Sequence, residues 1–212
     1  MSEEKPRDWA GYYAKTSERA PRPTLLRALD LLGESPRGRQ AVDLGCGGGR
    51  DSIEMLRRGW KLLAIDAEAA AIAALTSRND LPPGAALEGR VGRFEHARWP
   101  QAELVNSSFA LPLCDPGDFT VLWRNIVQSL MPGGCFAGQL FGERDSFHGR
   151  AGITTMSREQ ARGLLDGLDV AMFEEEETDA ITPRGKPKHW HLFHIVARRP
   201  RQSFLAPVTT SS

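Results

Sequence analysis

Short apolar runs alternate along the chain with segments whose apolar residues recur every three or four positions, and glycine or proline residues separate the two kinds. Short apolar runs predict strands, and spacings of three and four predict helices. The expected strands cover residues 40–44, 60–65, 86–91, 103–107, 135–141, 168–177 and 189–197. One helix is expected to begin within residues 21–24 and to end at Gly33, and others cover residues 50–58, 67–75, 118–130 and 157–165.

Turn and cap residues mark several boundaries between these elements. Residues 131–134 read Met-Pro-Gly-Gly and predict a turn, as does the polar stretch over residues 179–187. Ser157 followed by Gln160 is the sequence pattern of a capping box at the start of the last helix.

Strands and helices alternate from residue 40 onward, and the last two strands follow one another without a helix. Alternation predicts a parallel sheet with helices packed on both faces. The expected fold class is therefore α/β, with a doubly wound, mostly parallel seven-stranded sheet and an antiparallel strand pair at one edge. Ligands of such sheets bind beyond the carboxyl ends of the strands, where the strand order reverses.

The length of 212 residues is enough for one domain with a substantial core. Residues 1–20 are polar except for the aromatic side chains of Trp9, Tyr12 and Tyr13, which predict a short helix that packs on the domain as a possible lid. The main domain is expected over residues 21–198, and a flexible tail over residues 199–212.

Charge and cysteine content narrow the class of protein. Lysine plus arginine total 27, as do aspartate plus glutamate, so neither nucleic acid nor an anionic membrane is an expected partner. The apolar runs are shorter than the roughly 20 residues of a membrane helix, and the N-terminus lacks a signal-peptide pattern. Cys46, Cys114 and Cys135 form no CxxC pair, which disfavours a metal site and fits a reducing cytoplasm.

The most informative segment is a glycine loop, Asp43-Leu44-Gly45-Cys46-Gly47-Gly48-Gly49-Arg50, between an expected strand and an expected helix. Glycines permit a sharp turn and let a ligand approach the backbone. A dinucleotide loop requires GxGxxG, but Arg50 stands at the third glycine position. Asp43 would also repel a pyrophosphate, whereas it suits a ligand with cationic groups. S-adenosylmethionine has an ammonium and a sulfonium and no phosphate. An ordinary strand-to-helix turn is the alternative.

A second acid, Asp66, ends the next expected strand in the sequence Leu-Leu-Ala-Ile-Asp. An acid about 20 residues beyond a glycine loop is placed to accept hydrogen bonds from ribose hydroxyls. The alternative is that Asp66 caps the following helix. Two acids at adjacent strand ends around one glycine loop favour a nucleoside site.

Four motifs occur in order: AVDLGCGGGRDS, LLAID, ELVNSSFALPL and LMPGG. This set resembles the ordered motifs of class I S-adenosylmethionine-dependent methyltransferases, over roughly residues 9–198. Three further strings, GQLFGERDSF, FEEEE and KHWHLFHIVARR, are similar to a bacterial subgroup of tellurite-resistance-type methyltransferases.

The resemblance implies S-adenosylmethionine as cofactor and assigns roles around the first loop. Asp43 would organise contacts to the cofactor amino group, in part through water. Gly45, Cys46 and Gly47 would line the methionine portion, with Cys46 acting through its backbone rather than as a nucleophile. Asp66 would hold the ribose hydroxyls.

The resemblance also implies contacts from three further loops. Ala67 would touch the adenine, and Phe94 and Glu95 would cover it or meet its exocyclic amine. A surface position is the alternative for Glu95. Asn106 and Ser107 would face the methionine end and the incoming substrate. The family often has an acid near the position of Asn106, so the neutral amide here disfavours acid–base catalysis from it.

Five residues are candidates for contact with the acceptor. Tyr13 and Arg22 could close the site, with Arg22 pairing to the cofactor carboxylate. Arg144 follows an expected strand at the ligand end of the sheet, where it could orient a polar or anionic acceptor; pairing with Asp145 on the surface is the alternative. His189 and His191 share one face of a strand and could line the acceptor pocket, or be structural.

The predicted function is methyl transfer from S-adenosylmethionine to a small molecule by in-line displacement. The acceptor is left open among thiols, metalloid oxyanions, phenols and amines, and no catalytic residue is assigned. A non-catalytic S-adenosylmethionine-binding domain is one alternative, and an NAD-dependent oxidoreductase is another. The oligomeric state is not predicted.

Overall fold

The computed structural model describes residues 19–34, 38–182 and 185–201. The strands are β1 (Gln40–Leu44), β2 (Lys61–Asp66), β3 (Leu87–Val91), β4 (Ala102–Ser107), β5 (Leu130–Gly142), β6 (Thr155–Met156), β7 (Asp169–Ile181) and β8 (Pro187–Arg198). The α-helices are α2 (Pro23–Leu32), α3 (Ser52–Arg57), α4 (Ala69–Thr76), α5 (Pro116–Ser129) and α6 (Arg158–Gly163), and the 3-10 turns are η1 (Phe94–His96) and η2 (Leu111–Leu113).

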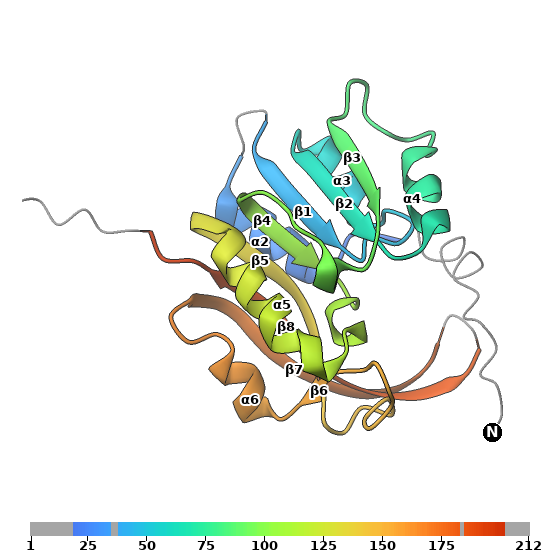
Figure 1. Cartoon of the computed structure of the whole chain (residues 1–212), viewed down its shortest axis with the longest axis vertical. Coiled ribbons are helices and arrows are strands. Elements are labelled where there is room, and N and C mark those ends of the chain that lie inside the picture. The colour runs from blue at the N-terminus through green and yellow to red at the C-terminus, as the bar shows by residue number, and fades with distance from the viewer. Residues whose placement is uncertain (1–18, 35–37, 183–184, 202–212) are drawn as a thin grey trace, which may run out of the picture.

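The strands form one mixed sheet with the order β3-β2-β1-β4-β5-β8-β7, and β6 pairs with β5 (Figure 1). Strands β1 to β5 run parallel, whereas β8 is antiparallel to both β5 and β7. This arrangement confirms the predicted α/β class with an antiparallel pair at one edge. The strand order reverses between β1 and β4, so their carboxyl ends flank the predicted crevice.

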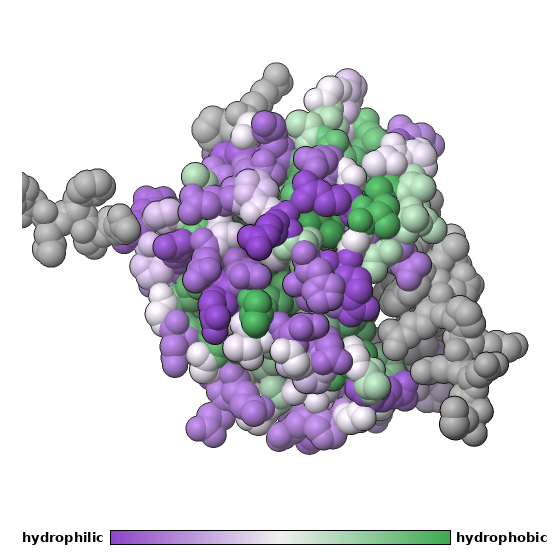
Figure 2. Space-filling view, viewed as in Figure 1, coloured by the Kyte–Doolittle hydropathy of each residue, from purple (hydrophilic) through white to green (hydrophobic). Residues whose placement is uncertain are grey.

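Two hydrophobic clusters fix the helices to the sheet. Alternate residues of β1 point to opposite faces, so Ala41 packs with α2, α3 and α4, and Val42 packs with α5 and α6. The longest helix, α5, begins with the Asp115 side chain accepting a hydrogen bond from the Gly117 N–H. Figure 2 shows mainly hydrophilic side chains over α5 and α6, as expected for their outer faces.

The expected turn at residues 131–134 is wrong in one respect, because β5 already begins at Leu130. The Gly133 N–H donates to the Arg199 carbonyl at 2.8 Å, and the Arg199 N–H donates to the Gly134 carbonyl at 2.8 Å. These bonds extend the strand through the glycines, although Gly133 keeps the positive φ of 83° that a turn requires. Arg199, the first residue of the expected tail, is thereby bonded to the sheet.

The capping box at Ser157 and Gln160 is confirmed, with both reciprocal hydrogen bonds present. The short turns η1 and η2 and the strand β6 were not predicted, because elements of two or three residues carry no periodic signal. In the described part of the chain, no helix has the length and apolar character that crossing a membrane requires.

Candidate functional site

The glycine loop leaves β1 and folds back against the end of β2. The N–H groups of Gly45 and Cys46 both donate to the Ile65 carbonyl, at 2.7 and 3.2 Å. Gly45 has a φ of 73°, and a Cβ there would lie 2.1 Å from the Ala110 Cβ. Backbone conformation and close packing therefore both require glycine at the first loop position.

Beneath the loop lies a buried group that we call the carboxylate cluster, made of Asp43, Asp51 and Asn106. The Asn106 amide nitrogen donates to Asp43 Oδ1 at 2.9 Å and to Asp51 Oδ2 at 3.3 Å. Ser52 donates to Asp43 Oδ2 at 2.6 Å, and Ser108 donates to Asp51 Oδ2 at 2.5 Å. The pairing of β1 with β4 sets Asp43 directly beside Asn106. The sheet register thus brings two acids to one bridging amide.

Burial and negative charge coincide in this cluster. Asp43 is 2% exposed and Asp51 is 4% exposed. Burial, and next the charge of Asp51, raise the pKa of Asp43 to about 7. Asn106 Oδ1 is also buried, and it is the one such side-chain oxygen or nitrogen without a hydrogen-bond partner in the described residues. Two buried acids and an unsatisfied acceptor fit a positively charged N–H donor, such as an ammonium group.

Asp66 lies at the end of β2 on the other side of the loop. Its Oδ2 accepts from the Gly47 N–H at 2.8 Å, and its Oδ1 accepts from the Glu68 N–H at 2.9 Å. The alternative, that Asp66 caps the following helix, is only partly correct. Asp66 accepts from the N–H of Glu68, but Glu68 itself is the N-cap residue of α4. Burial raises the pKa of Asp66. Each carboxylate oxygen keeps capacity for a further hydrogen bond.

The remaining predicted residues around the loop differ in their exposure. Ala67 is exposed after β2, and Phe94 is buried in η1, near the loop at Gly45. The Glu95 side chain is 2% exposed and pairs with Arg93, so the alternative of a surface glutamate is wrong. The Ser107 hydroxyl donates to the Leu44 carbonyl at 3.0 Å, which ties β4 to the start of the loop.

Cys46 is buried in the loop itself. Burial, and next the charge of Asp43, raise the pKa of its thiol well above the usual range. The protonated thiol is a poor nucleophile, in line with a role for its backbone.

The entry to α2 approaches the carboxylate cluster from a distant part of the chain. The Arg22 N–H donates to Asp51 Oδ1 at 2.9 Å, and the Arg22 guanidinium lies 4.2 Å from the centre of the Phe109 ring. Arg22 is therefore brought to the predicted site. Tyr13, the other predicted closing residue, lies outside the described residues, as do most of the expected N-terminal helix and tail.

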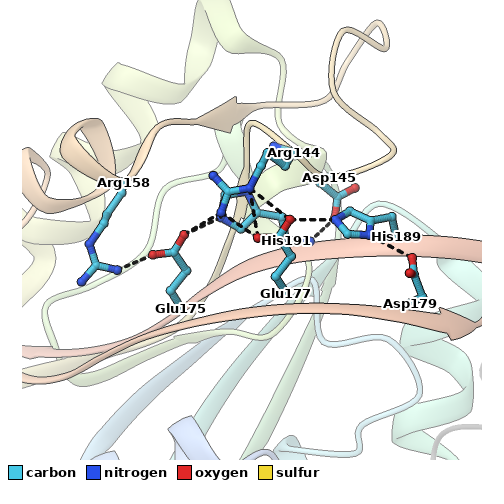
Figure 3. A network of polar contacts seen from close by, with 8 residues as sticks. All are labelled: Arg144, Asp145, Arg158, Glu175, Glu177, Asp179, His189 and His191. Atoms are coloured by element: carbon cyan, nitrogen blue, oxygen red, sulfur yellow. Dashed lines mark hydrogen bonds and ion pairs between the residues drawn. The ribbon is translucent and has the colours of Figure 1, made fainter.

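Arg144, His189 and His191 belong instead to a separate network of polar contacts on the β7–β8 hairpin (Figure 3). Arg144 binds Glu177 at 2.7 Å and Glu175 at 3.0 Å, so the suggested pairing with Asp145 is wrong. The two histidines share one face, as predicted: His191 contacts Glu175 at 2.8 Å, and His189 contacts Glu177 at 3.0 Å. Among the described residues, no group of three or more histidine, cysteine or acidic side chains is arranged to hold a metal ion.

Asp145 has a different and buried partner, Lys188, which the sequence did not single out. Asp145 Oδ1 also accepts from the Phe147 N–H at 2.8 Å, and Asp145 Oδ2 accepts from the His191 N–H at 3.2 Å. The Lys188 ammonium lies 3.6 Å from the Phe147 ring centre and 4.1 Å from that of Trp190. Burial lowers the pKa of Lys188. The pair fixes the segment after β5 against the start of β8.

The structure thus gathers the residues predicted around the loop and adds Asp51, Ser52 and Ser108 to them. Asp51 and Ser52 follow the glycines closely in sequence, and that proximity was the available signal. The partners of Asp51 come from the entry to α2 and from β4 and the loop after it, so only the fold reveals the cluster.

A family model described as a methyltransferase domain matches residues 41–134, which include the glycine loop, Asp66 and Asn106. The trans-aconitate 2-methyltransferase of Afipia carboxidovorans is 31% identical over 140 residues, which are 63% of this chain and 50% of the relative. The chain therefore matches about half the length of this curated relative.

Solved structures share the fold at low sequence identity. TehB from Haemophilus influenzae gives a TM-score of 0.72 at 14% identity, covering 90% of this chain and 67% of that one. The 1,6-didemethyltoxoflavin-N1-methyltransferase of Burkholderia thailandensis, solved with 1,6-didemethyltoxoflavin and S-adenosylhomocysteine, gives 0.61 at 21% identity, covering 90% and 82%. The domain match over residues 41–134 agrees with the resemblance to class I S-adenosylmethionine-dependent methyltransferases, and these neighbours confirm the fold that it implies.

Proposed function

We propose that this chain binds S-adenosylmethionine at the glycine loop and transfers its methyl group to a small-molecule acceptor. The carboxylate cluster is the observation that carries this proposal. It presents two buried acids and the unpartnered Asn106 Oδ1, and a cationic N–H donor satisfies all three. The match of residues 41–134 to a methyltransferase domain supports the same cofactor.

Different residues around the glycine loop bind different parts of the cofactor. Asp43 and Asn106 hold the amino group, and the bare backbone of Gly45 and Gly47 lies along the methionine portion. Asp66 accepts hydrogen bonds from the ribose hydroxyls while its bonds to the loop keep its carboxylate oriented. Phe94, which is buried in η1 after β3, covers the adenine.

Ala67, Glu95 and Ser107 complete the proposed cofactor site. Ala67 lies beneath the adenine, and Glu95 accepts from its exocyclic amine. Ser107 acts through the backbone, because its hydroxyl is bonded to Leu44.

When bound, the cofactor supplies a methyl group on a sulfonium, which needs no activation by the protein. The chain's part is to orient the reactants and to exclude water, which contribute several kcal/mol, up to about 7–11 in model reactions. Asn106 bridges two acids and is itself neutral, so no general base is assigned at this position.

An NAD-dependent oxidoreductase is disfavoured, because Asp43 and Asp51 would face a pyrophosphate across the loop. An assay of methyl transfer distinguishes an enzyme from a domain that binds the cofactor without catalysis. Purified protein is incubated with radiolabelled S-adenosylmethionine and a panel of thiols, metalloid oxyanions, phenols, amines and carboxylic acids. Transfer to one class establishes the enzyme; tight cofactor binding with no transfer to any class contradicts it.

We also infer that the protein works in a reducing cytoplasm. Cys46, Cys114 and Cys135 are all buried and unpaired, which fits a compartment that keeps thiols reduced. Cell fractionation with antibody detection tests this location.

A further inference from the structure

One face of β5 carries a buried amide side chain where the alternation predicts an apolar residue. Cys135, Ala137 and Phe141 are buried along this face, and Gln139, which is 1% exposed, lies between Ala137 and Phe141. Side chains two residues apart on a strand share a face, so Gln139 lies in the layer that packs against α2. A buried amide costs free energy unless its polar atoms are hydrogen-bonded. The hydrogen bonds of Gln139 therefore account for an amide at this position.

Gln139 uses both ends of its amide to join two segments that are far apart in the chain. The Phe109 N–H donates to Gln139 Oε1 at 3.1 Å, and Gln139 Nε2 donates to the Thr24 hydroxyl at 2.9 Å. Thr24 lies in the first turn of α2 and is buried. A backbone N–H can only donate, so the amide oxygen must face Phe109. The side chain therefore links the loop after β4 to the start of α2 in one orientation.

Phe109 needs such an anchor, because its backbone is strained. Its φ is 57°, and among the described residues it is the one residue other than glycine with a positive φ. This conformation is unfavourable for a bulky side chain, and it persists only where the surrounding structure holds it. The hydrogen bond from the Phe109 N–H to Gln139 is such a restraint. Without that bond, the backbone of Phe109 is free to relax to a negative φ.

The residues on either side of Phe109 contact the two parts of the proposed cofactor site. Ser108 donates its hydroxyl to Asp51 in the carboxylate cluster at 2.5 Å. Ala110 packs against the glycine loop, where its Cβ lies 2.1 Å from the position that a Cβ at Gly45 would occupy. The bend at Phe109 therefore sets both contacts, and a relaxed backbone there would move Ser108 or Ala110 away.

Asp51 anchors the same two segments from the side of the glycine loop. Its Oδ2 accepts from Ser108, and its Oδ1 accepts from the backbone N–H of Arg22 at 2.9 Å. The partners of Gln139 are the next residue of that loop and a residue in the first turn of α2. Two buried side chains thus tie the loop after β4 to the entry to α2 at two points. Asp51 belongs to the carboxylate cluster, whereas Gln139 is not among the residues assigned to the cofactor.

We propose that Gln139 is a positioning residue for the cofactor site, which it shapes by holding Phe109 in the left-handed conformation. The restraint keeps Ser108 on Asp51 and Ala110 on the glycine loop. This inference rests on the proposed function and adds to it a residue that acts through others. The loop after β4 is then formed before S-adenosylmethionine arrives, so binding does not have to order it. Loss of the restraint weakens cofactor binding while the apolar core remains packed.

The test measures the Kd for S-adenosylmethionine by calorimetry and the free energy of unfolding in urea, for the full chain and its variants. Gln139→Met keeps an unbranched side chain of similar size and removes the acceptor of the Phe109 N–H, and Thr24→Val removes the hydroxyl at the other end of the amide. Phe109→Gly, alone and combined with Gln139→Met, introduces a residue that adopts a positive φ without strain. Ser129→Ala is the control, because it removes a side-chain hydrogen bond from Trp99 Nε1, 2.8 Å long, at the end of α5.

Gln139→Met should raise the Kd for S-adenosylmethionine at least about tenfold, and Thr24→Val should raise it about threefold. In the Phe109→Gly background, Gln139→Met should raise the Kd no more than about threefold, because glycine keeps the bend without the restraint. Ser129→Ala should lower the free energy of unfolding and leave the Kd unchanged.

A Gln139→Met protein that loses stability but binds S-adenosylmethionine as tightly as the unaltered chain overturns this inference alone. So does an equal loss of affinity with and without Phe109→Gly, which would show that Gln139 acts independently of Phe109. If Gln139→Met does not fold, Thr24→Val decides, and an unchanged Kd in that variant overturns the inference. No binding of S-adenosylmethionine by the unaltered chain contradicts the proposed function itself.

Discussion

Replacement of Asp43 by asparagine should have opposite effects on two quantities. It should raise the free energy of unfolding, because no charge is buried, and it should lower the affinity for the cofactor. The substitution keeps the shape of the side chain, and both hydrogen bonds survive it: the amide oxygen accepts from Asn106, and the amide nitrogen donates to the Ser52 hydroxyl. The removed feature is a charge that burial and Asp51 disfavour, since they raise the Asp43 pKa from 3.8 to about 7.

Proton linkage gives the direction in which the free energy of unfolding changes with pH. Between these two pKa values the folded chain binds a proton at Asp43 that the unfolded chain has lost, so the contribution of Asp43 to stability falls as pH rises. Relative to a neutral side chain, the cost is about 2 kcal/mol at pH 5 and about 4 kcal/mol at pH 8. Asp43→Asn should therefore stabilise the ligand-free protein, and the gain should grow by about 2–3 kcal/mol between these pH values.

Urea unfolding monitored by circular dichroism at pH 5, 6.5 and 8 measures this gain. Asp30→Asn is the control, because Asp30 is exposed and lies 3.5 Å from Arg58, so its effect should be small. The same Asp43→Asn protein should bind S-adenosylmethionine at least about tenfold more weakly at pH 8. A gain that does not change with pH, or a loss of stability at pH 8, would refute the argument from burial.

Three further substitutions test other parts of the structure. Gly45→Ala should abolish cofactor binding, because its Cβ would lie 2.1 Å from the Ala110 Cβ. The control Gly84→Ala, with a similar φ of 71° and no atom within 4 Å, should cost only the backbone strain of about 1–2 kcal/mol. Thermal unfolding measures the stability of both variants and calorimetry their cofactor binding, and equal binding by the two would contradict this prediction. Asp66→Ala should weaken cofactor binding by about 1–3 kcal/mol, measured by calorimetry against the exposed control Asp30→Ala, and unchanged affinity would remove Asp66 from the ribose site. Asp145→Ala should lower the free energy of unfolding by about 3–5 kcal/mol, because it leaves the Lys188 ammonium buried without its acid, and the double variant Asp145→Ala/Lys188→Met should lose less than Asp145→Ala alone; a double variant that loses as much in urea unfolding would show that the pair does not act in this way.

The layout of the sheet was predictable because it depends on local patterns. The apolar run of β1, the glycines after it and Asp66 at the end of β2 each carry a signal within a few residues. Alternation of strands and helices predicts a parallel sheet but not its strand order, and the pairing of β1 with β4 that sets Asp43 beside Asn106 is known from the structure.

The electrostatic partners were not predictable, because they join segments far apart in the chain. Arg22 reaches Asp51 from the entry to α2, and Lys188 reaches Asp145 from β8. Arg144 next to Asp145 suggested a local pair, but the β7–β8 register places Glu175 and Glu177 beside Arg144 instead. Phe109 gave no signal at all, since nothing in its neighbours indicates a positive φ.

We propose above that the carboxylate cluster and the glycine loop form a site for a cationic nucleoside. Calorimetric titration of the dialysed protein with S-adenosylmethionine, S-adenosylhomocysteine and NAD at pH 8 tests it directly. We expect micromolar binding of the first two ligands, which Gly45→Ala should abolish, and no binding of NAD. Micromolar binding of NAD, with none of S-adenosylmethionine, would contradict it.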